Sequence, residues 1–416
     1  MALGFQIGNL VRTLSHYNFG LYVAGSIASL VGTWMHRVAT GWLTWEMTGS
    51  AGWLGLIAFA DLFPSVLIAP FAGVAADRWD RHRMMKLAQS AGGVAAALLA
   101  VLYFLDALNI WGLLAITLVL GVMDSFVQPF RLAFTAGLVP KDELAAAVAI
   151  KSVTFNLARF LGPALAGFII AGWGVGWAFV ANALSFIVFL VTLCLIHIDA
   201  SELDARTPAK AGLLSEAFAG IKYAFSSSGI GAVVVLLLAT CLAGRPVVEL
   251  LPGWAAEIFS GGAGDLAALT SSIGIGAVAG GLWLAGRPSP EGLTRAFLIC
   301  SLGLSLSLIG FSSSSHTYIA IPMMVVMGFF LVTSAICAQT LIQVNVEDGM
   351  RGRVLSVYAI VLRGGPALGA LIMGFAAEHF GLRLPLIVGA LVLLAVSAVA
   401  WTRLTALTPA LEGKLR

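Results

Sequence analysis

Apolar runs of about 20 residues or more, separated by short polar stretches, recur along the whole chain. A hydrocarbon layer about 30 Å thick is crossed by about 20 helical residues, so each run can cross a membrane once. Backbone groups in lipid must pair among themselves, and the runs lack the alternation of barrel strands, so they are predicted to be helices. About twelve spans are predicted, at 18–46, 52–76, 84–107, 111–134, 144–172, 176–197, 229–257, 266–287, 294–311, 317–343, 352–377 and 384–406.

The longest polar connection, residues 198–228, divides the predicted spans into two sets of equal number. Its second portion, 213–226, has apolar residues at helical spacing and predicts an amphipathic helix at the membrane surface. The tetrapeptide Gly-Pro-Ala-Leu at 162–165 recurs at 365–368, at the same place in the second half. The predicted fold class is therefore an all-α membrane protein with two pseudo-symmetric six-helix bundles, 1–197 and 229–416, joined by the cytoplasmic linker 198–228.

Composition excludes a soluble protein, because 60% of the 416 residues are hydrophobic and only 10% are charged. Most of the 23 lysines and arginines fall at the two ends or in alternate loops, which the positive-inside rule assigns to the cytoplasm. Both termini are therefore predicted to be cytoplasmic. The net charge of +3 follows from this bias and implies no nucleic-acid partner. The Ala/Gly-rich composition and the lack of Asn-x-Ser/Thr sequons favour a bacterial inner membrane, with a monomer expected.

Several charged residues lie deep inside the predicted spans, where each costs about 3 kcal/mol to insert. Packing alone would not select such residues, so they are candidates for transport and coupling. They are Arg37, Asp61, Asp124, Arg159, Arg245, Glu249 and Arg363.

Depth along a hairpin suggests pairs among the residues of the first half. Arg37 and Asp61 lie equally far from the turn between the first two spans and are expected to pair, as a static ion pair or as a gate. Asp124 and Arg159 both lie near the midplane, where a role in substrate or ion binding is favoured over a structural one. Asp124 is expected to lack a partner on its own helix, which makes it the first candidate for the coupling acid, ahead of Asp61 and Glu249.

The second half offers a different arrangement. Arg245 and Glu249 are four residues apart and either neutralise each other on one helix face or take part in transport. Arg363 has no acid nearby in its own span, which predicts a cation facing a cavity or a backbone carbonyl.

The loop between the second and third spans carries a motif of small, acidic and basic residues: Gly73, Asp77, Arg78, Arg81 and Arg83. Here the chain resembles the major facilitator superfamily, whose signature in this loop is Gly-x-x-x-Asp-Arg-x-Gly-Arg-Arg. Asp80 replaces the second glycine and His82 interrupts the basic pair. The resemblance implies a cytoplasmic gate in which Gly73 lets helices approach, Asp77 accepts from the start of the eleventh span, and the arginines bridge the halves. An ordinary positively charged loop is the alternative.

Gly162, Pro163 and Gly167 in the fifth span resemble the helix-five motif of drug and metabolite exporters, with a packing kink as the alternative. Stretches within 42–50, 129–140 and 155–159 resemble a bacterial exporter branch that includes the enterobactin exporter and macrolide-efflux proteins. The mid-depth arginine that many proton-coupled exporters carry in the fourth span is missing.

These features predict a transporter and not an enzyme, since the chain has no nucleophile elbow, metal-ligand cluster or phosphate-binding loop. No cofactor or metal is expected. The resemblance implies a proton-coupled exporter of an amphipathic small molecule (a drug, siderophore or similar metabolite) that works by alternating access. An uptake symporter or a lysolipid flippase of the same fold is the main alternative, and an intramembrane enzyme or a receptor is a lesser one.

Overall fold

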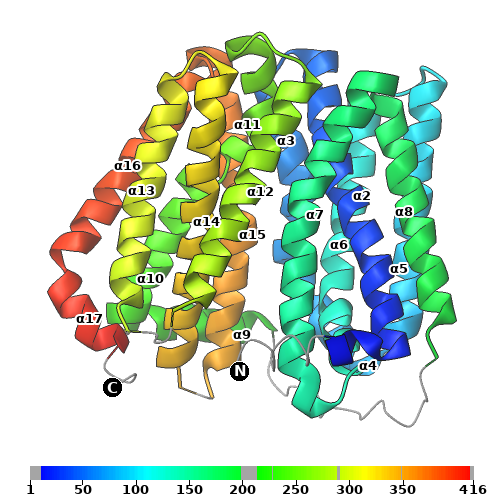
Figure 1. The fold of residues 1–416 in the computed structure, drawn as a ribbon. Coiled ribbons are helices and arrows are strands. Elements are labelled where there is room, and N and C mark those ends of the chain that lie inside the picture. The colour runs from blue at the N-terminus through cyan, green and yellow to red at the C-terminus, as the bar shows by residue number, and fades with distance from the viewer. Residues whose placement is uncertain (1–10, 198–212, 227, 288–290, 348, 413–416) are drawn as a thin grey trace. The chain divides into compact units, whose positions relative to one another are not determined.

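The computed structural model describes residues 11–197, 213–226, 228–287, 291–347 and 349–412 (Figure 1). Over these ranges the chain forms helices and no strand, which confirms the all-α prediction. Most of the predicted linker, 198–212, lies outside the described residues. In the described part, 11 helices are long and apolar enough to cross a membrane.

Contacts divide the chain into two compact units, and the first contains residues 1–43 and 67–210. Its described helices run roughly parallel to one another (Figure 1). They are α2 (Tyr17–Thr48) up to residue 43, α4 (Pro64–Arg78) from residue 67, α5 (Arg81–Phe104), α6 (Ile110–Ala136), the short η1 (Lys141–Glu143), α7 (Leu144–Trp173) and α8 (Val175–Leu195).

The second unit contains residues 44–66 and 211–416. Its described elements are α3 (Ala51–Leu62), α9 (Leu213–Ser226), α10 (Ser228–Ala239), η3 (Thr240–Gly244), α11 (Val247–Gly253), η4 (Trp254–Ile258), α12 (Ala263–Ala285), α13 (Leu293–Ser313), α14 (Thr317–Asn345), α15 (Arg351–Phe380), α16 (Arg383–Thr402) and α17 (Leu404–Glu412). The helix expected at 213–226 is therefore present as α9. The two six-helix halves stay a prediction, and α3 is grouped here with helices that follow it in the chain by more than one hundred and fifty residues.

Polar side chains at the loop ends set where several helices begin. The Ser50 hydroxyl accepts from the Trp53 N–H at 3.1 Å, and the Asn109 amide oxygen accepts from the Gly112 N–H at 2.8 Å. Asp80 likewise accepts from the backbone N–H of Arg83 at 3.0 Å and starts α5. Each bond satisfies an N–H group that has no partner inside its own helix.

Two predicted spans are interrupted in the structure. The span predicted at 52–76 is two helices, α3 and α4, because Pro64 has no N–H to donate within the helix, while Phe63 before it keeps helical dihedral angles (φ −67°, ψ −32°). The span predicted at 229–257 contains α10 and α11 separated by the π turn η3, and a second π turn, η4, follows α11. Such turns widen a helix locally and occur often at functional sites.

Helices pack through small residues in the second unit and through aromatic rings in the first. In the second unit, a Cβ at Gly276 of α12 would overlap the backbone of α14, and a Cβ at Gly328 of α14 would overlap the backbone of α12. In the first unit, the inner packing is aromatic: Tyr22 lies 5.6 Å from Phe134 and 5.8 Å from Phe189, measured between ring centroids. Close backbone approach is the usual way in which helices associate in lipid.

Candidate functional site

Two of the deep arginines in the first unit contact one tryptophan. The guanidinium carbon of Arg37 lies 5.3 Å from the centroid of the Trp34 ring, and that of Arg159 lies 5.6 Å from the same centroid. The ring of Phe155 meets Trp34 edge-on at 5.9 Å. Trp34 and Arg37 come from α2, whereas Arg159 and Phe155 come from α7. We call these four residues the Trp34 cluster.

Gly162 allows α7 to come close enough to α2 to form the Trp34 cluster. A Cβ at Gly162 would overlap the Trp34 side chain and would lie 3.0 Å from the Val31 carbonyl oxygen. Pro163 and Gly167, the other members of the helix-five motif, are buried on α7. One turn of α7 therefore carries Arg159 and the glycine that places it.

The Trp34 cluster combines an apolar wall with two positive charges. Trp34, Arg37 and Arg159 are half-buried, and the Phe155 side chain is 44% exposed. A guanidinium near an aromatic ring is stabilised by the ring quadrupole, and the attraction is larger where water is scarce. The arrangement holds two cations at mid-depth of a span and can receive a molecule that offers both an apolar face and negative charge.

The sequence indicated the arginines but not the ring that they share. Arg37 was expected to pair with Asp61, and Arg159 with Asp124, from depth alone. Those two pairings stay predictions. The signal for Trp34 was present, because residues three apart on a helix lie on one face and Trp34 precedes Arg37 by three.

Asp124 has a partner on its own helix, so the expectation of none was wrong. The Gln128 side-chain amide donates to the Asp124 carboxylate at 3.0 Å. The two residues are one turn apart on α6, a spacing at which polar side chains meet. The bond was not predicted because the expected pairs join charged residues at equal depth, and Gln128 is neutral.

The deep charges of the second unit lie on either side of a close helix contact. Arg245 directly follows the π turn η3, which contains the buried Cys241. A Cβ at Gly365 of α15 would lie 2.5 Å from the Cβ of Cys241. Arg363 is half-buried two residues before that glycine, and Glu249 is half-buried on α11. Mutual neutralisation of Arg245 and Glu249, and a carbonyl or cavity facing Arg363, stay predictions.

The repeated tetrapeptide occupies equivalent places in the two units. Gly162 is where α7 meets α2, and Gly365 is where α15 meets η3. In each copy the glycine precedes a buried proline within a long helix, Pro163 or Pro366. The glycine of each copy therefore lets two helices approach closely, and the role of the helix-five motif in export stays a prediction.

The gate motif is partly described. Asp80, the residue that departs from the superfamily signature, caps α5, which accounts for an acid in place of glycine. Arg81 donates to the Ala76 carbonyl at 3.2 Å, and the Arg83 side chain is exposed. No described atom lies within 4 Å of the place that a Cβ would take at Gly73, so the expected helix approach is not seen there. The side chains of Asp77 and Arg78 lie outside the described set.

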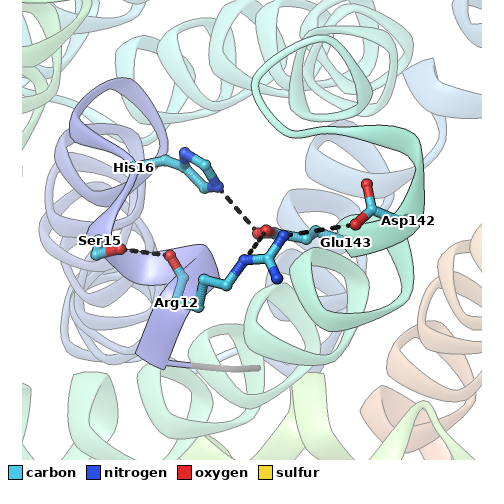
Figure 2. A network of polar contacts seen from close by, with 5 residues as sticks. All are labelled: Arg12, Ser15, His16, Asp142 and Glu143. Atoms are coloured by element: carbon cyan, nitrogen blue, oxygen red, sulfur yellow. Dashed lines mark hydrogen bonds and ion pairs between the residues drawn. The ribbon is translucent and has the colours of Figure 1, made fainter. Parts of the chain in front are cut away.

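A polar network not predicted from the sequence joins the start of the first span to the start of α7 (Figure 2). The Arg12 Nε lies 2.7 Å from one Glu143 carboxylate oxygen, and the His16 Nε2 lies 3.0 Å from the other. Asp142 lies 3.5 Å from Arg12, and both are largely exposed, whereas the Glu143 side chain is 6% exposed. Burial raises the pKa of Glu143, but hydrogen bonds from Thr13 and His16 and the charge of Arg12 outweigh it and hold that pKa below its usual range.

The family to which the chain belongs is shown by comparison with known proteins. The family model of transmembrane secretion effectors matches residues 11–412, nearly the whole chain. The chain belongs to this family of the major facilitator superfamily. The resemblance seen in the loop motif is thereby confirmed, and so is the prediction of a transporter that is not an enzyme.

The chain also matches individual relatives of nearly its own length. It is 26% identical to the staphyloferrin A transporter of Staphylococcus aureus, over 87% of this chain and 90% of the relative. It is 27% identical to the enterobactin exporter of Escherichia coli, over 93% of each chain. It is 21% identical to the macrolide efflux protein A of Streptococcus pyogenes, over 86% of this chain and 89% of the relative.

Solved structures share the fold of this chain. A bacterial homologue of the human lysosomal transporter Spinster matches with a TM-score of 0.71 and 14% identity, over 97% of this chain and 99% of that one. A D-xylose-proton symporter matches with a TM-score of 0.68 and 14% identity, over 95% and 97%. At such identities the likeness establishes the fold alone.

Proposed function

We propose that this transporter exports an amphipathic small molecule in exchange for protons, by alternating access between the halves 1–197 and 229–416. Relatives named for siderophore transport, siderophore export and macrolide efflux support the choice of export and of substrate class. The bias of lysines and arginines supports a bacterial inner membrane as the location, with cytoplasmic termini. The protein is proposed to act as a monomer.

The Trp34 cluster is the observation on which the proposal rests most. A ring contacted by Arg37 and Arg159 suits a substrate that has an apolar or aromatic body and an acidic group. Charges so costly at mid-depth mark substrate or ion pathways in membrane proteins. In the second half, Arg245, Glu249 and Arg363 are proposed to take the corresponding part.

Asp124 is the proposed coupling acid, with Asp61 and Glu249 as the next candidates. Asp124 is half-buried on α6, one helix before the helix that carries Arg159. Charges at mid-depth of a span are costly, so a proton bound by this carboxylate would change the balance of charge around it.

Binding tests the site directly. Enterobactin, staphyloferrin A and a macrolide serve as probes in a thermal-shift titration of purified protein. Trp34→Leu is expected to weaken binding of the effective probe about tenfold, because contacts of about 1–2 kcal/mol with the ring are lost. Trp111→Leu is the matched control, since Trp111 is 65% exposed at the start of α6. If Trp34→Leu binds the probe as tightly as the parent does, the Trp34 cluster is not part of the binding site.

Transport in vesicles of defined sidedness tests direction and coupling. In inside-out vesicles, an exporter that exchanges its substrate for protons accumulates the probe when the lumen is acidic. An uptake symporter would instead lose the probe from an acidic lumen. A lysolipid flippase would move a fluorescent lysolipid between leaflets and leave the soluble probes where they were.

A further inference from the structure

The start of α3 is held by a carboxylate from α15. The Glu378 Oε1 accepts a hydrogen bond from the Ser50 hydroxyl at 2.5 Å and one from the Gly52 backbone N–H at 2.7 Å. The Ser50 hydroxyl also accepts from the Trp53 N–H. A carboxylate therefore occupies the first turn of α3, where N–H groups lack partners in their own helix and the helix dipole is positive.

Below this contact α3 and α15 touch backbone to backbone. A Cβ at Gly55 of α3 would overlap the Ala370 carbonyl of α15, and a Cβ at Gly374 of α15 would lie 2.5 Å from the Ala51 carbonyl oxygen. It would also lie 3.1 Å from the Gly55 Cα. The backbones approach this closely because small residues, Gly55 on α3 and Ala370 and Gly374 on α15, line the seam.

The contact joins two helices that are far apart in the chain. α3 is preceded and followed by segments of the first unit, residues 1–43 and 67–210, yet its own contacts place residues 44–66 in the second unit. In terms of the predicted halves, α3 belongs to the first and Glu378 to the second. A motion that carries α3 along with the first half parts α3 from α15.

We propose that Glu378, Ser50 and the first turn of α3 form a clasp that keeps the outer ends of the two halves closed and that opens in each transport cycle. The proposal rests on the alternating-access function proposed above. Both hydrogen bonds end on one exposed carboxylate, and water can replace them when the clasp opens. The bonds are charge-assisted, so they favour the closed state although they are few.

A buried thiol in the seam reports whether the clasp is closed. Ala51 is 6% exposed, and Ala51→Cys is made in a Cys194→Ser background because Cys194 is exposed, whereas the other cysteines are buried. The rate of maleimide labelling is measured in lipid nanodiscs, where both faces of the protein meet the reagent. Hydrogen exchange of residues 50–62, in protein without the added cysteine, is the second measurement.

Glu378→Gln is expected to raise the labelling rate about tenfold, because the closed state loses a charge-assisted acceptor. Ser50→Ala is expected to raise it as well, since one bond and the α3 cap are lost. Asp265→Asn is the matched control: Asp265 accepts from the Gly262 N–H at 3.1 Å and caps its own helix without joining two. The control is expected to label as slowly as the parent.

Labelling and hydrogen exchange that stay at the parent value in both Glu378→Gln and Ser50→Ala would overturn the clasp. Equal acceleration in Asp265→Asn would also overturn it, since the effect would then be general loosening. If the parent moves no probe in vesicles while Glu378→Gln still labels faster, the transport proposal fails, and Glu378 remains as a contact that holds α3 to α15 without a role in a transport cycle.

Discussion

At the scale of single residues, Trp34 shows how a membrane protein keeps two like charges together. Arg37 and Arg159 both approach the Trp34 ring, so one side chain contributes to the stabilisation of two cations. Trp34, Arg37 and Arg159 are all half-buried. An aromatic ring stabilises a nearby cation through its quadrupole and adds no negative charge of its own.

Asp124→Asn is expected to bind substrate but lose the dependence of export on a pH gradient, because the amide cannot gain or lose the proton. Export by vesicles is measured at several imposed gradients. Gln128→Leu is the control, since it removes the donor to Asp124 and keeps the acid, and it is expected to retain a pH response. If Asp124→Asn exports with the same pH response as the parent, Asp124 is not the coupling acid, and Asp61 is the next candidate.

At the scale of elements, the apolar runs predicted where helices lie better than where they break. Length and hydropathy determine that a run crosses the membrane, and these are local properties. The break at Pro64 was visible as a proline, but the π turns η3 and η4 depend on neighbouring packing, such as Gly365 against Cys241. Glu378 lies just past a predicted span, and its partner Ser50 is found only once the helices are in place.

Glu143→Gln is expected to destabilise the joint between the first span and α7. The pKa of Glu143 is held below its usual value of 4.5, so the carboxylate contributes stability fully above that value and loses it as the pH falls through the lowered pKa. Thermal unfolding in detergent is measured from neutral to acidic pH. The parent is expected to lose its advantage over Glu143→Gln at the acidic end, and Asp142→Asn, at an exposed position, should show little change. An advantage that persists unchanged at the most acidic pH would contradict this account.

At the scale of the whole molecule, the bias of lysines and arginines predicts on which side of the membrane each loop lies. The division of the chain into two compact units comes instead from contacts between helices. Lysines and arginines act on insertion through their position in the chain, so counting them is enough to predict an orientation, which stays a prediction. The grouping of α3 with the second unit depends on Gly55 and Gly374. The role of these two glycines becomes visible only when α3 and α15 are seen packed together. Glycine is too common in this chain, at 47 residues, for the seam to be found from the sequence.

Single cysteines test the predicted orientation. Met47→Cys and Ser313→Cys are expected to react with an impermeant maleimide added outside intact cells, and Trp79→Cys only after the membrane is opened. The parent positions Met47 and Trp79 are 37% and 53% exposed, so access to reagent is not limited by burial. The Cys194→Ser background keeps native thiols silent. Labelling of Trp79→Cys from outside intact cells would contradict the predicted orientation.

The pairing of α3 with α15 also sets a condition on biosynthesis. Ser50 and Glu378 are separated by 328 positions, so a ribosome makes most of the chain after α3 before its partner exists. During that time the glycine surface of α3 faces lipid or a temporary neighbour, such as an insertion chaperone. A fragment that stops before α15 would keep this surface permanently unmatched, which makes α3 the natural place for quality control to distinguish an unfinished chain from a finished one.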